Sequence, residues 1–207
     1  MRALATLPTA SRVPKILLYR LLNRSDYRRW TNPANLETWW DSRTQQMASL
    51  VPPGTRVLEF GAGRRQLERF LPPTCSYVPS DLADRGPGTV ICDLNHRPLP
   101  DLRIVRADVA FFAGVLEYIR DLPSLIEWLF SEVSYCVASY AYATSPPRTP
   151  RRLIESIRRA RYGYMNTYNE EQLETLFSTR GFGCVRKDTW DSQRLFLFQA
   201  GSRASAK

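Results

Sequence analysis

The sequence has few of the residues that usually build metal centres. It contains a single histidine and four cysteines, and no two cysteines form a C-x-x-C pair. Zinc sites need Cys and His ligands at close, regular spacings, so no metal site is predicted. The thiols of Cys75, Cys92, Cys136 and Cys184 are expected to stay free in a reducing compartment. A run of about 18 apolar residues is also missing, which argues against a membrane span. We predict a cytoplasmic protein, with peripheral membrane association or organelle targeting as alternatives.

Lysine is scarce as well. Among 29 basic residues only Lys15, Lys187 and Lys207 are lysines. Arginine suits forked contacts with phosphate or carboxylate, but a coding preference for arginine would explain the ratio equally well. Residues 1–30 and 146–162 are strongly basic, and together they exceed the net charge of +9, so the rest of the chain is slightly acidic. Such segments can attract an anionic substrate, a membrane surface or nucleic acid.

The chain of 207 residues, 43% of them hydrophobic, is long enough for one domain with a sizeable core. Residues 1–25 contain no acid, which loosely fits a transit peptide. The apolar segment 16–22 instead favours a structured N-terminal extension that docks on the domain or lies at a membrane interface. We therefore predict a basic extension over residues 1–35, a domain over 36–200 and a frayed tail over 201–207.

Residues 55–70 are the segment around which the rest of the chain is arranged. Val57, Leu58 and Phe60 predict a buried strand, Gly61 and Gly63 end it, and a helix is expected from residue 67. A strand that turns through glycines into a helix gathers backbone N–H groups around one point, which a ligand can approach closely. Glu59, the last acid on the strand, is expected to face the same crevice.

Two further acids follow short apolar segments. Residues 75–79 predict a second strand closed by Asp81, and residues 89–95 a third that ends at Asp93. A carboxylate at the tip of the second strand can accept both hydroxyls of a ribose, although a turn or helix cap is the alternative interpretation. The turn residues 85–88 leave no room for a helix, so the crossover between these strands is expected to be abbreviated.

Two motifs carry a family resemblance. Glu59, Gly61 and Gly63 have the Glu-x-Gly-x-Gly spacing of motif I of the class I S-adenosylmethionine-dependent methyltransferases, with Arg65 in place of the third glycine. Residues 107–119 resemble motif IV of the same family, with Tyr118 where many relatives have histidine. The resemblance covers about residues 36–200. It implies an α/β, Rossmann-like fold: a mostly parallel sheet of about seven strands, helices on both faces and an antiparallel C-terminal strand.

The resemblance also implies S-adenosylmethionine as cofactor. The implied cofactor-binding residues are Glu59, Gly61, Ala62, Gly63, Asp81, Leu82, Asp93, Leu94 and Gly114, and the implied catalytic residues on the substrate side are Tyr118 and Glu117. Tyrosine is a poor base at neutral pH. We therefore expect catalysis by positioning and desolvation, because the sulfonium is itself the activated group.

The remaining segments predict a helix from Asn32 to residue 50, a helix after Asp121, a strand over 134–142, a helix from Asn169 and two closing strands over 183–190 and 194–199. The arginine-rich insert 145–164 contains a short amphipathic helix. We expect it to lie over the carboxyl edge of the sheet and to select an anionic acceptor through Arg151 and Arg152. A solvated helix with no such role is the alternative.

The predicted function is methyl transfer to a small-molecule, glycan or lipid acceptor, which the charge suggests is anionic. An RNA methyltransferase is an alternative that the same charge encourages. An NAD-linked oxidoreductase is disfavoured because Gln66 stands where its fingerprint needs glycine. A non-catalytic scaffold on the same fold is favoured by Arg65 and Tyr118, and the fold alone does not exclude it. The sequence does not predict an oligomeric state.

Overall fold

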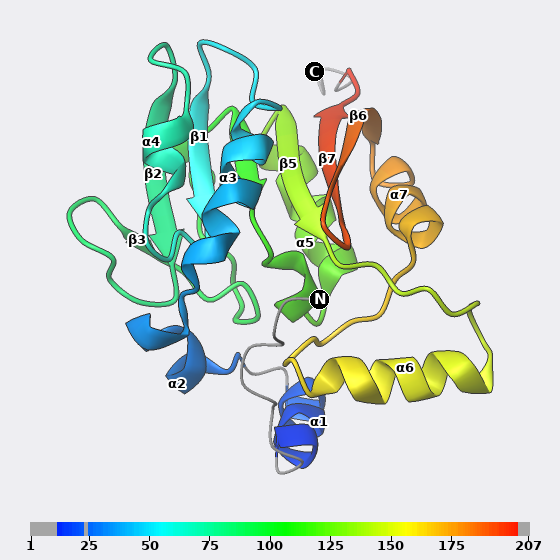
Figure 1. Ribbon diagram of the computed structural model, residues 1–207. Helices are drawn as coiled ribbons and strands as arrows, with labels where there is room; N and C mark the ends of the chain where they lie inside the picture. The colour runs from blue at the N-terminus through cyan, green and yellow to red at the C-terminus, as the bar shows by residue number, and fades with distance from the viewer. Residues whose placement is uncertain (1–11, 23–24, 203–207) are drawn as a thin grey trace.

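Seven strands form one sheet in the order β3-β2-β1-β4-β5-β7-β6 in the computed structural model, which describes residues 12–22 and 25–202 (Figure 1). The strands are β1 (Arg56–Phe60), β2 (Ser76–Asp81), β3 (Val90–Ile91), β4 (Val109–Phe112), β5 (Tyr135–Tyr140), β6 (Phe182–Trp190) and β7 (Gln193–Ala200). The first five pair in parallel, and β7 pairs antiparallel with both β5 and β6. This arrangement confirms the predicted Rossmann-like sheet.

The α-helices are α1 (Arg12–Leu22), α2 (Tyr27–Trp30), α3 (Asp41–Ala48), α4 (Leu67–Phe70), α5 (Leu122–Glu132), α6 (Pro150–Ala160) and α7 (Glu170–Ser178). Short 3-10 turns are η1 (Pro33–Asn35), η2 (Thr38–Trp40), η3 (Leu102–Ile104) and η4 (Leu116–Tyr118). The N-cap residues Asp121 and Asn169 were both expected from the sequence. Each accepts a backbone N–H of the helix it begins, α5 and α7 respectively.

The sheet has a hydrophobic core on each face. Alternate residues of β1 point to opposite faces: Leu58 and Phe60 pack with α5 and α7, whereas Val57 packs with α3 and α4. All four residues of β4 are buried, as expected for a parallel strand covered on both sides. The helices therefore cover both faces, and the ligand-accessible part of the sheet is its edge.

The carboxyl ends of β1, β2, β4 and β5 meet at the lower edge of the molecule in Figure 1, where α1, α2 and α6 also lie. Parallel strands bring their carboxyl ends together, so residues that directly follow these strands gather at this edge. The predicted insert over the carboxyl edge corresponds to α6 and its flanking loops, and its predicted position is confirmed.

Three predicted elements differ in extent. The helix expected from Asn32 is divided into η1, η2 and α3, because Leu36 and Glu37 have extended backbone conformations. Only two residues of the predicted third strand join the sheet. Residues 82–89 contain no helix, so the abbreviated crossover is confirmed. The division at residues 35 and 200 stays a prediction, and residues 1–11, 23–24 and 203–207 lie outside the description.

Candidate functional site

The bend after β1 has the backbone that the glycines predict. Gly61 and Gly63 have φ values of +71° and +51°, in the left-handed region that glycine adopts without strain. A Cβ at Gly61 would lie 2.6 Å from Cγ2 of Val115, and one at Gly63 would lie 3.6 Å from Cδ2 of Leu36. Ala62 between them is buried, and its N–H donates to Ser80 at 3.0 Å. The bend thus fits tightly against the segments around it.

Arg65 has a left-handed backbone conformation, which glycine adopts more easily than other residues. Its φ is +58°, which costs an L-residue about 1–2 kcal/mol relative to glycine. The guanidinium donates to Pro87 O at 3.0 Å and to Oε2 of Glu68 at 3.1 Å. Arg65 therefore ties the crossover between β2 and β3 to the start of α4.

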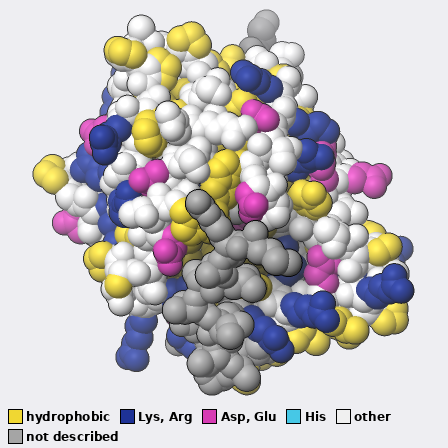
Figure 2. Space-filling model, in the orientation of Figure 1, with side chains coloured by type: hydrophobic (Ala, Val, Ile, Leu, Met, Phe, Trp, Pro, Cys, Tyr) yellow, Lys and Arg dark blue, Asp and Glu magenta, His cyan; other side chains and the backbone are white. Residues whose placement is uncertain are grey.

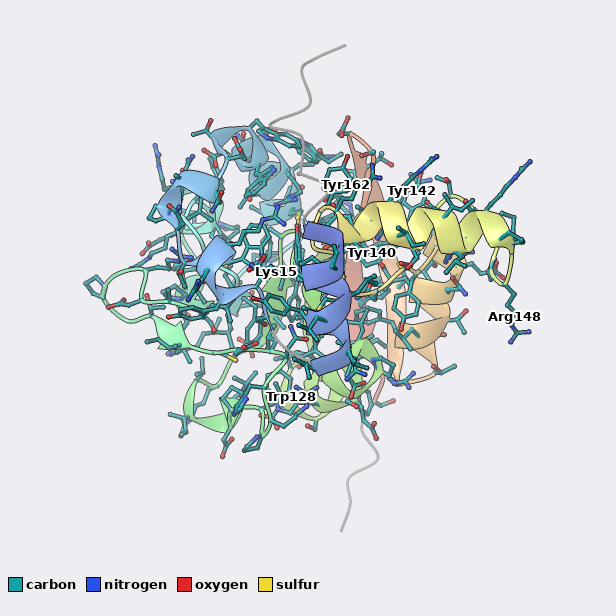
Figure 3. The ribbon with its side chains drawn as sticks, turned by 90° about the horizontal axis from the view of Figure 1, so that it is seen from below. Lys15, Trp128, Tyr140, Tyr142, Arg148 and Tyr162 are labelled. Atoms are coloured by element: carbon teal, nitrogen blue, oxygen red, sulfur yellow. The ribbon has the colours of Figure 1, made fainter. Side chains whose placement is uncertain are left out.

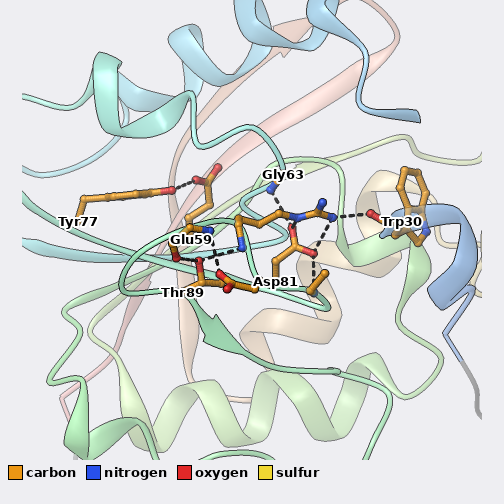
Figure 4. Close-up of polar contacts among 10 residues, drawn as sticks. Trp30, Glu59, Gly63, Tyr77, Asp81 and Thr89 are labelled. Atoms are coloured by element: carbon orange, nitrogen blue, oxygen red, sulfur yellow. Dashed lines mark hydrogen bonds and ion pairs between the residues drawn. The ribbon is translucent and has the colours of Figure 1, made fainter. Parts of the chain in front are cut away.

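Glu59 is buried beneath the bend. Its Oε2 accepts the hydroxyl proton of Tyr77 at 2.6 Å, as Figure 4 shows. Burial raises the pKa of the Glu59 carboxyl to about 8, although the Tyr77 hydrogen bond acts in the opposite direction. Glu59 and Asp81 lie on the same side of the sheet, and the Asp81 charge raises the pKa of Glu59 further. The predicted proximity of these two acids is confirmed.

Asp81, at the end of β2, is held by neighbouring groups on both carboxylate oxygens. Oδ2 accepts the N–H of Gly63 at 2.8 Å and lies 3.1 Å from Nε of Arg85 (Figure 4). Oδ1 accepts Nη2 of Arg85 at 3.2 Å. The same Nη2 also donates to the carbonyl of Trp30. The acid predicted to bind a ribose therefore takes part in a buried ion pair whose arginine comes from the abbreviated crossover.

Asp93 is also in contact with the N-terminal segment. Its Oδ1 accepts the hydroxyl of Ser25 at 2.6 Å and the N–H of Asn95 at 2.9 Å. The side chain of Asn95 continues this network, donating to Ser25 Oγ and to the carbonyl of Tyr118, each at 2.9 Å. Residues 25–30 thus reach both Asp81, through Arg85, and Asp93. They join the tips of two neighbouring strands.

Leu94 and Leu82, both predicted to contact the cofactor, differ in how deeply they are buried. Leu94 belongs to the hydrophobic core together with Leu102 and α5, so its side chain is not exposed beside Asp93. Leu82, directly after Asp81, is half-buried. Leu82 is therefore partly open to solvent beside Asp81, whereas Leu94 supports the strand end from the core.

An arginine that the sequence did not indicate as a site residue lies at the carboxyl end of β4. Arg43 of α3 is buried, and its Nη2 donates to Ala113 O at 3.0 Å. The guanidinium lies against the bare Cα of Gly114, where a Cβ would be 2.5 Å from Nη1. Burial lowers the pKa of Arg43. Its spacing from Trp40 and Met47 places it on the apolar face of the predicted helix. A charged residue on that face is the feature of the sequence that could have indicated a buried arginine.

Glu117 interacts electrostatically with both Arg43 and Arg159. Oε1 of Glu117 accepts the N–H of Ala141 at 2.7 Å, and burial raises the pKa of the carboxyl. The positive charges of Arg43 and Arg159 act in the opposite direction. Within the part of the chain that the structure describes, Oε2 of Glu117, Nε of Arg43, and Nε and Nη2 of Arg159 are buried without a hydrogen-bond partner. Buried polar atoms call for a hydrogen-bond partner, and a ligand placed between Glu117, Arg43 and Arg159 would supply one.

Tyr118 sits in an aromatic cluster. Its ring contacts those of Trp30 and Tyr164 edge-on, with centroids 4.8 and 5.3 Å apart. Arg159 lies over the Tyr164 ring at 4.7 Å. Burial raises the pKa of Tyr118 well above its usual value of 10, so the phenol holds its proton at neutral pH. The arrangement supports the prediction that Tyr118 is not a base.

A hollow of about 560 Å³ lies along α7, lined by residues of that helix and by Cys184 of β6, and none of its lining residues belongs to the bend after β1. Residues 12–22 and 25–202 contain no group of three or more His, Cys, Asp or Glu arranged to hold a metal ion. The same residues form no helix that is both long and apolar enough to cross a membrane.

The residue types at the carboxyl edge fit an adenosyl cofactor. Gly63 and Asp81 are already joined by a hydrogen bond, and Asp93 lies at the neighbouring strand end. The groups that contact these carboxylates, Arg85 and Ser25, are donors, as ribose hydroxyls and an adenine amino group are. A bound cofactor would therefore take over contacts that the protein makes to itself.

Known structures share this fold at low sequence identity. The putative O-methyltransferase NPUN_R0239 from Nostoc punctiforme superposes with a TM-score of 0.66 at 12% identity, covering 93% of this chain and 69% of that one. The Burkholderia thailandensis 1,6-didemethyltoxoflavin-N1-methyltransferase, solved with its substrate and S-adenosylhomocysteine, gives 0.60 at 16%, covering 98% and 93%. CalO1, a methyltransferase of calicheamicin biosynthesis solved with S-adenosylhomocysteine, gives 0.58 at 14% and covers 81% of this chain.

This chain spans only 56% of the length of CalO1. No curated protein matches the sequence. A sequence profile described as a methyltransferase domain, however, matches residues 22–187, which is most of the chain. The match includes the glycine bend, all three strand-end acids and the segment around Glu117 and Tyr118. The chain belongs to the methyltransferase domain family.

Proposed function

We propose that this protein transfers a methyl group from S-adenosylmethionine to a small-molecule, glycan or lipid acceptor that carries an anionic group. The observation that carries the proposal is the meeting of two features at one sheet edge. One is the glycine bend with Asp81 hydrogen-bonded to Gly63. The other is the buried pair Arg43 and Arg159 with unpartnered N–H groups beside Glu117.

On the cofactor side, the residues that would hold S-adenosylmethionine are Glu59, Gly61, Ala62, Gly63, Asp81, Leu82, Asp93, Leu94 and Gly114. Asp81 and Asp93 would contact it directly, whereas Glu59 and Leu94 would support the bend and the strand end from their buried positions. When bound, the cofactor supplies an electrophilic methyl group on a sulfonium, so the protein needs no separate activating group for the methyl donor.

On the acceptor side, Arg159 and Arg43 offer buried donors to an anion. A buried charge without full compensation is costly, and a carboxylate or phosphate group would satisfy the unpartnered N–H groups. The carboxylate of the cofactor is an alternative occupant for Arg43, which lies against Gly114. We assign Arg159 to the acceptor because it belongs to α6, in the insert that covers this edge.

Glu117 is the group that we assign to receive a proton from the acceptor. Its pKa is raised and its Oε2 is unpartnered among the described residues, so it can hold a hydrogen bond to a hydroxyl or amine. Tyr118 would align the acceptor through its ring, since its proton is firmly held. Desolvation and alignment would supply most of the rate enhancement.

Two experiments test this function. In the first, S-adenosylhomocysteine should raise the thermal midpoint of the protein and NAD should not. In the second, labelled S-adenosylmethionine is offered with small-molecule, lipid and RNA fractions of a lysate. Label in the RNA fraction alone would replace the proposed acceptor with RNA.

Once an acceptor is known, Arg159→Gln should raise the KM for the acceptor about tenfold or more and should change the KM for the cofactor little. Arg161→Gln, an exposed neighbour on the same segment, serves as the control. An increase confined to the cofactor KM would assign the buried arginines to the cofactor carboxylate instead.

A non-catalytic scaffold is the second candidate. The observation that favours it is the buried ion pair of Asp81 with Arg85, which occupies the expected ribose contact. A protein that shows no thermal shift with S-adenosylhomocysteine and labels no fraction would support the scaffold over the enzyme.

A further inference from the structure

Helix α6 exposes its apolar side. Leu153, Ile154 and Ile157 are 64%, 51% and 41% exposed, whereas Arg152 and Arg159 on the opposite side are buried. A surface helix of a globular protein normally buries its apolar stripe and exposes its charges. The orientation of α6 is therefore reversed, and its apolar stripe needs another explanation than packing in the core of this chain.

The reversed orientation is fixed by specific contacts. The guanidinium of Arg152 donates to Ser145 O and Thr167 O at 2.8 Å each and to Oε1 of Gln172 at 2.6 Å. The carboxylate of Glu155 accepts the N–H groups of Thr144 and Ser145, both at 2.9 Å. These bonds hold the polar side against the domain, so the apolar side cannot turn inward without breaking them.

Helix α1 presents a similar stripe beside α6. Leu17, Leu18, Leu21 and Leu22 are exposed at the spacing of one helix face, while Ile16 on the other face is 1% exposed. The two helices contact each other. Seen from below, both lie on the outer side of the carboxyl edge, with Lys15 on α1 marking its position (Figure 3). We name the exposed stripes of these two contacting helices, taken together, the α1–α6 surface.

The charges around the α1–α6 surface are of one sign. Arg151, Arg158 and Arg161 are exposed next to the apolar stripe of α6. Dark blue and yellow side chains lie side by side in this region, at the lower right of Figure 2. The acids nearest these helices are already paired, because Glu155 accepts backbone N–H groups on the inner side of α6 and Asp26 pairs with Lys15 of α1 at 2.8 Å. An anionic partner would meet little repulsion here.

We infer that the α1–α6 surface binds an anionic lipid bilayer. Exposed leucine and isoleucine stripes flanked by arginines are what an interfacial helix needs, since the apolar side chains enter the acyl region and the arginines meet the headgroups. An RNA partner would use the arginines but leave the apolar stripes exposed to water. The opposite side of α6 carries Arg159, so a bound bilayer would lie directly outside the candidate site. This inference does not depend on the reaction proposed above.

Vesicle co-sedimentation of the full chain tests it. The protein should sediment with phosphatidylcholine vesicles that contain phosphatidylglycerol and stay in solution with phosphatidylcholine alone. Arg151→Glu/Arg158→Glu should weaken binding ~25-fold or more, at about fivefold for each arginine. Leu153→Ser/Ile157→Ser, which keeps the charge, should weaken it about tenfold. Arg56→Glu/Arg186→Glu changes the net charge equally at exposed positions away from this surface and should bind like the wild type.

Three results would overturn the inference. The first is absence of binding to the anionic vesicles. The second is an equal loss of vesicle binding in the Arg56/Arg186 variant, or no loss of binding in the serine variant. Either result would mean that the net charge of the protein, and not this surface, causes the binding. The third is sedimentation without vesicles that the serine variant abolishes, which would assign the surface to contact between copies of this chain. The thermal midpoint of each variant, measured alongside, separates lost binding from lost folding.

Discussion

The guanidinium of Arg85 lies against the carboxylate of Asp81, with Nε 3.1 Å from Oδ2 and Nη2 3.2 Å from Oδ1. Both side chains are buried, at 7% and 6% exposure. In the proposed function Asp81 receives the ribose hydroxyls, so cofactor binding and this ion pair would compete for the same two carboxylate oxygens.

Competition at Asp81 predicts opposite effects of two substitutions on affinity for S-adenosylhomocysteine. Asp81→Asn should weaken binding about tenfold or more, because a charged acceptor is lost. Arg85→Met should strengthen binding, because the unbound protein then holds a buried carboxylate without its cation. Isothermal titration measures both. Equal weakening by the two substitutions would instead make Arg85 part of the cofactor site.

The raised pKa of Glu59 predicts a pH-dependent stability. The carboxyl has a pKa of about 8 in the folded protein and about 4.5 when unperturbed, so the folded state binds more protons between these values. Its favourable contribution is complete below about pH 4.5 and is lost as the pH rises through 8. Glu59→Gln should remove this loss, on the order of a few kcal/mol. Urea unfolding of both proteins across this range checks it, and parallel curves would contradict it.

The hydrogen bonds of Arg152 predict that it anchors α6 to the domain, whereas the neighbouring Arg151 does not. Arg152→Ala should lower the free energy of unfolding by about 2–4 kcal/mol, because three acceptors lose a charged donor. It should also speed hydrogen exchange in α6. Arg151→Ala, exposed on the same helix, should change either quantity little. Similar effects of the two substitutions would mean that Arg152 does not anchor the insert.

Substitutions at two glycines with positive φ distinguish the cost of backbone strain from the cost of steric crowding. Gly54 has φ +74° and open space around a built Cβ, so Gly54→Ala should cost about 1 kcal/mol. Gly181 has φ +90°, and its Cβ would lie 2.3 Å from the ring of Phe130. Gly181→Ala should therefore cost about 1–3 kcal/mol more. Chemical denaturation measures the difference, and equal costs would show that the Phe130 ring yields freely.

The sheet and its strand ends were predictable because they depend on local patterns. Apolar segments ended by glycine or an acid define β1 and β2, and parallel pairing then brings Glu59 and Asp81 together. The partners of these acids were not predictable. Arg85 is close to Asp81 in sequence, but nothing in a Gly-Pro turn says that its side chain folds back, and Ser25 lies 68 residues from Asp93.

The orientation of α6 could not be predicted for a different reason. Periodicity shows that a helix has an apolar and a polar side, but not which side faces the domain. Arg151 and Arg152 looked equivalent in the sequence, and we expected both to contact an acceptor. The structure corrects this for Arg152, whose three hydrogen bonds to the protein leave it in an anchoring position.

The abbreviated crossover between β2 and β3 also affects how the sheet meets other chains. It leaves β3, at one border, with two residues, too few to align a foreign strand. The opposite border, β6, is longer, but a bulge between Cys184 and Arg186 and the charged run that follows interrupt it. Fibrous growth through strand addition is therefore disfavoured at both borders.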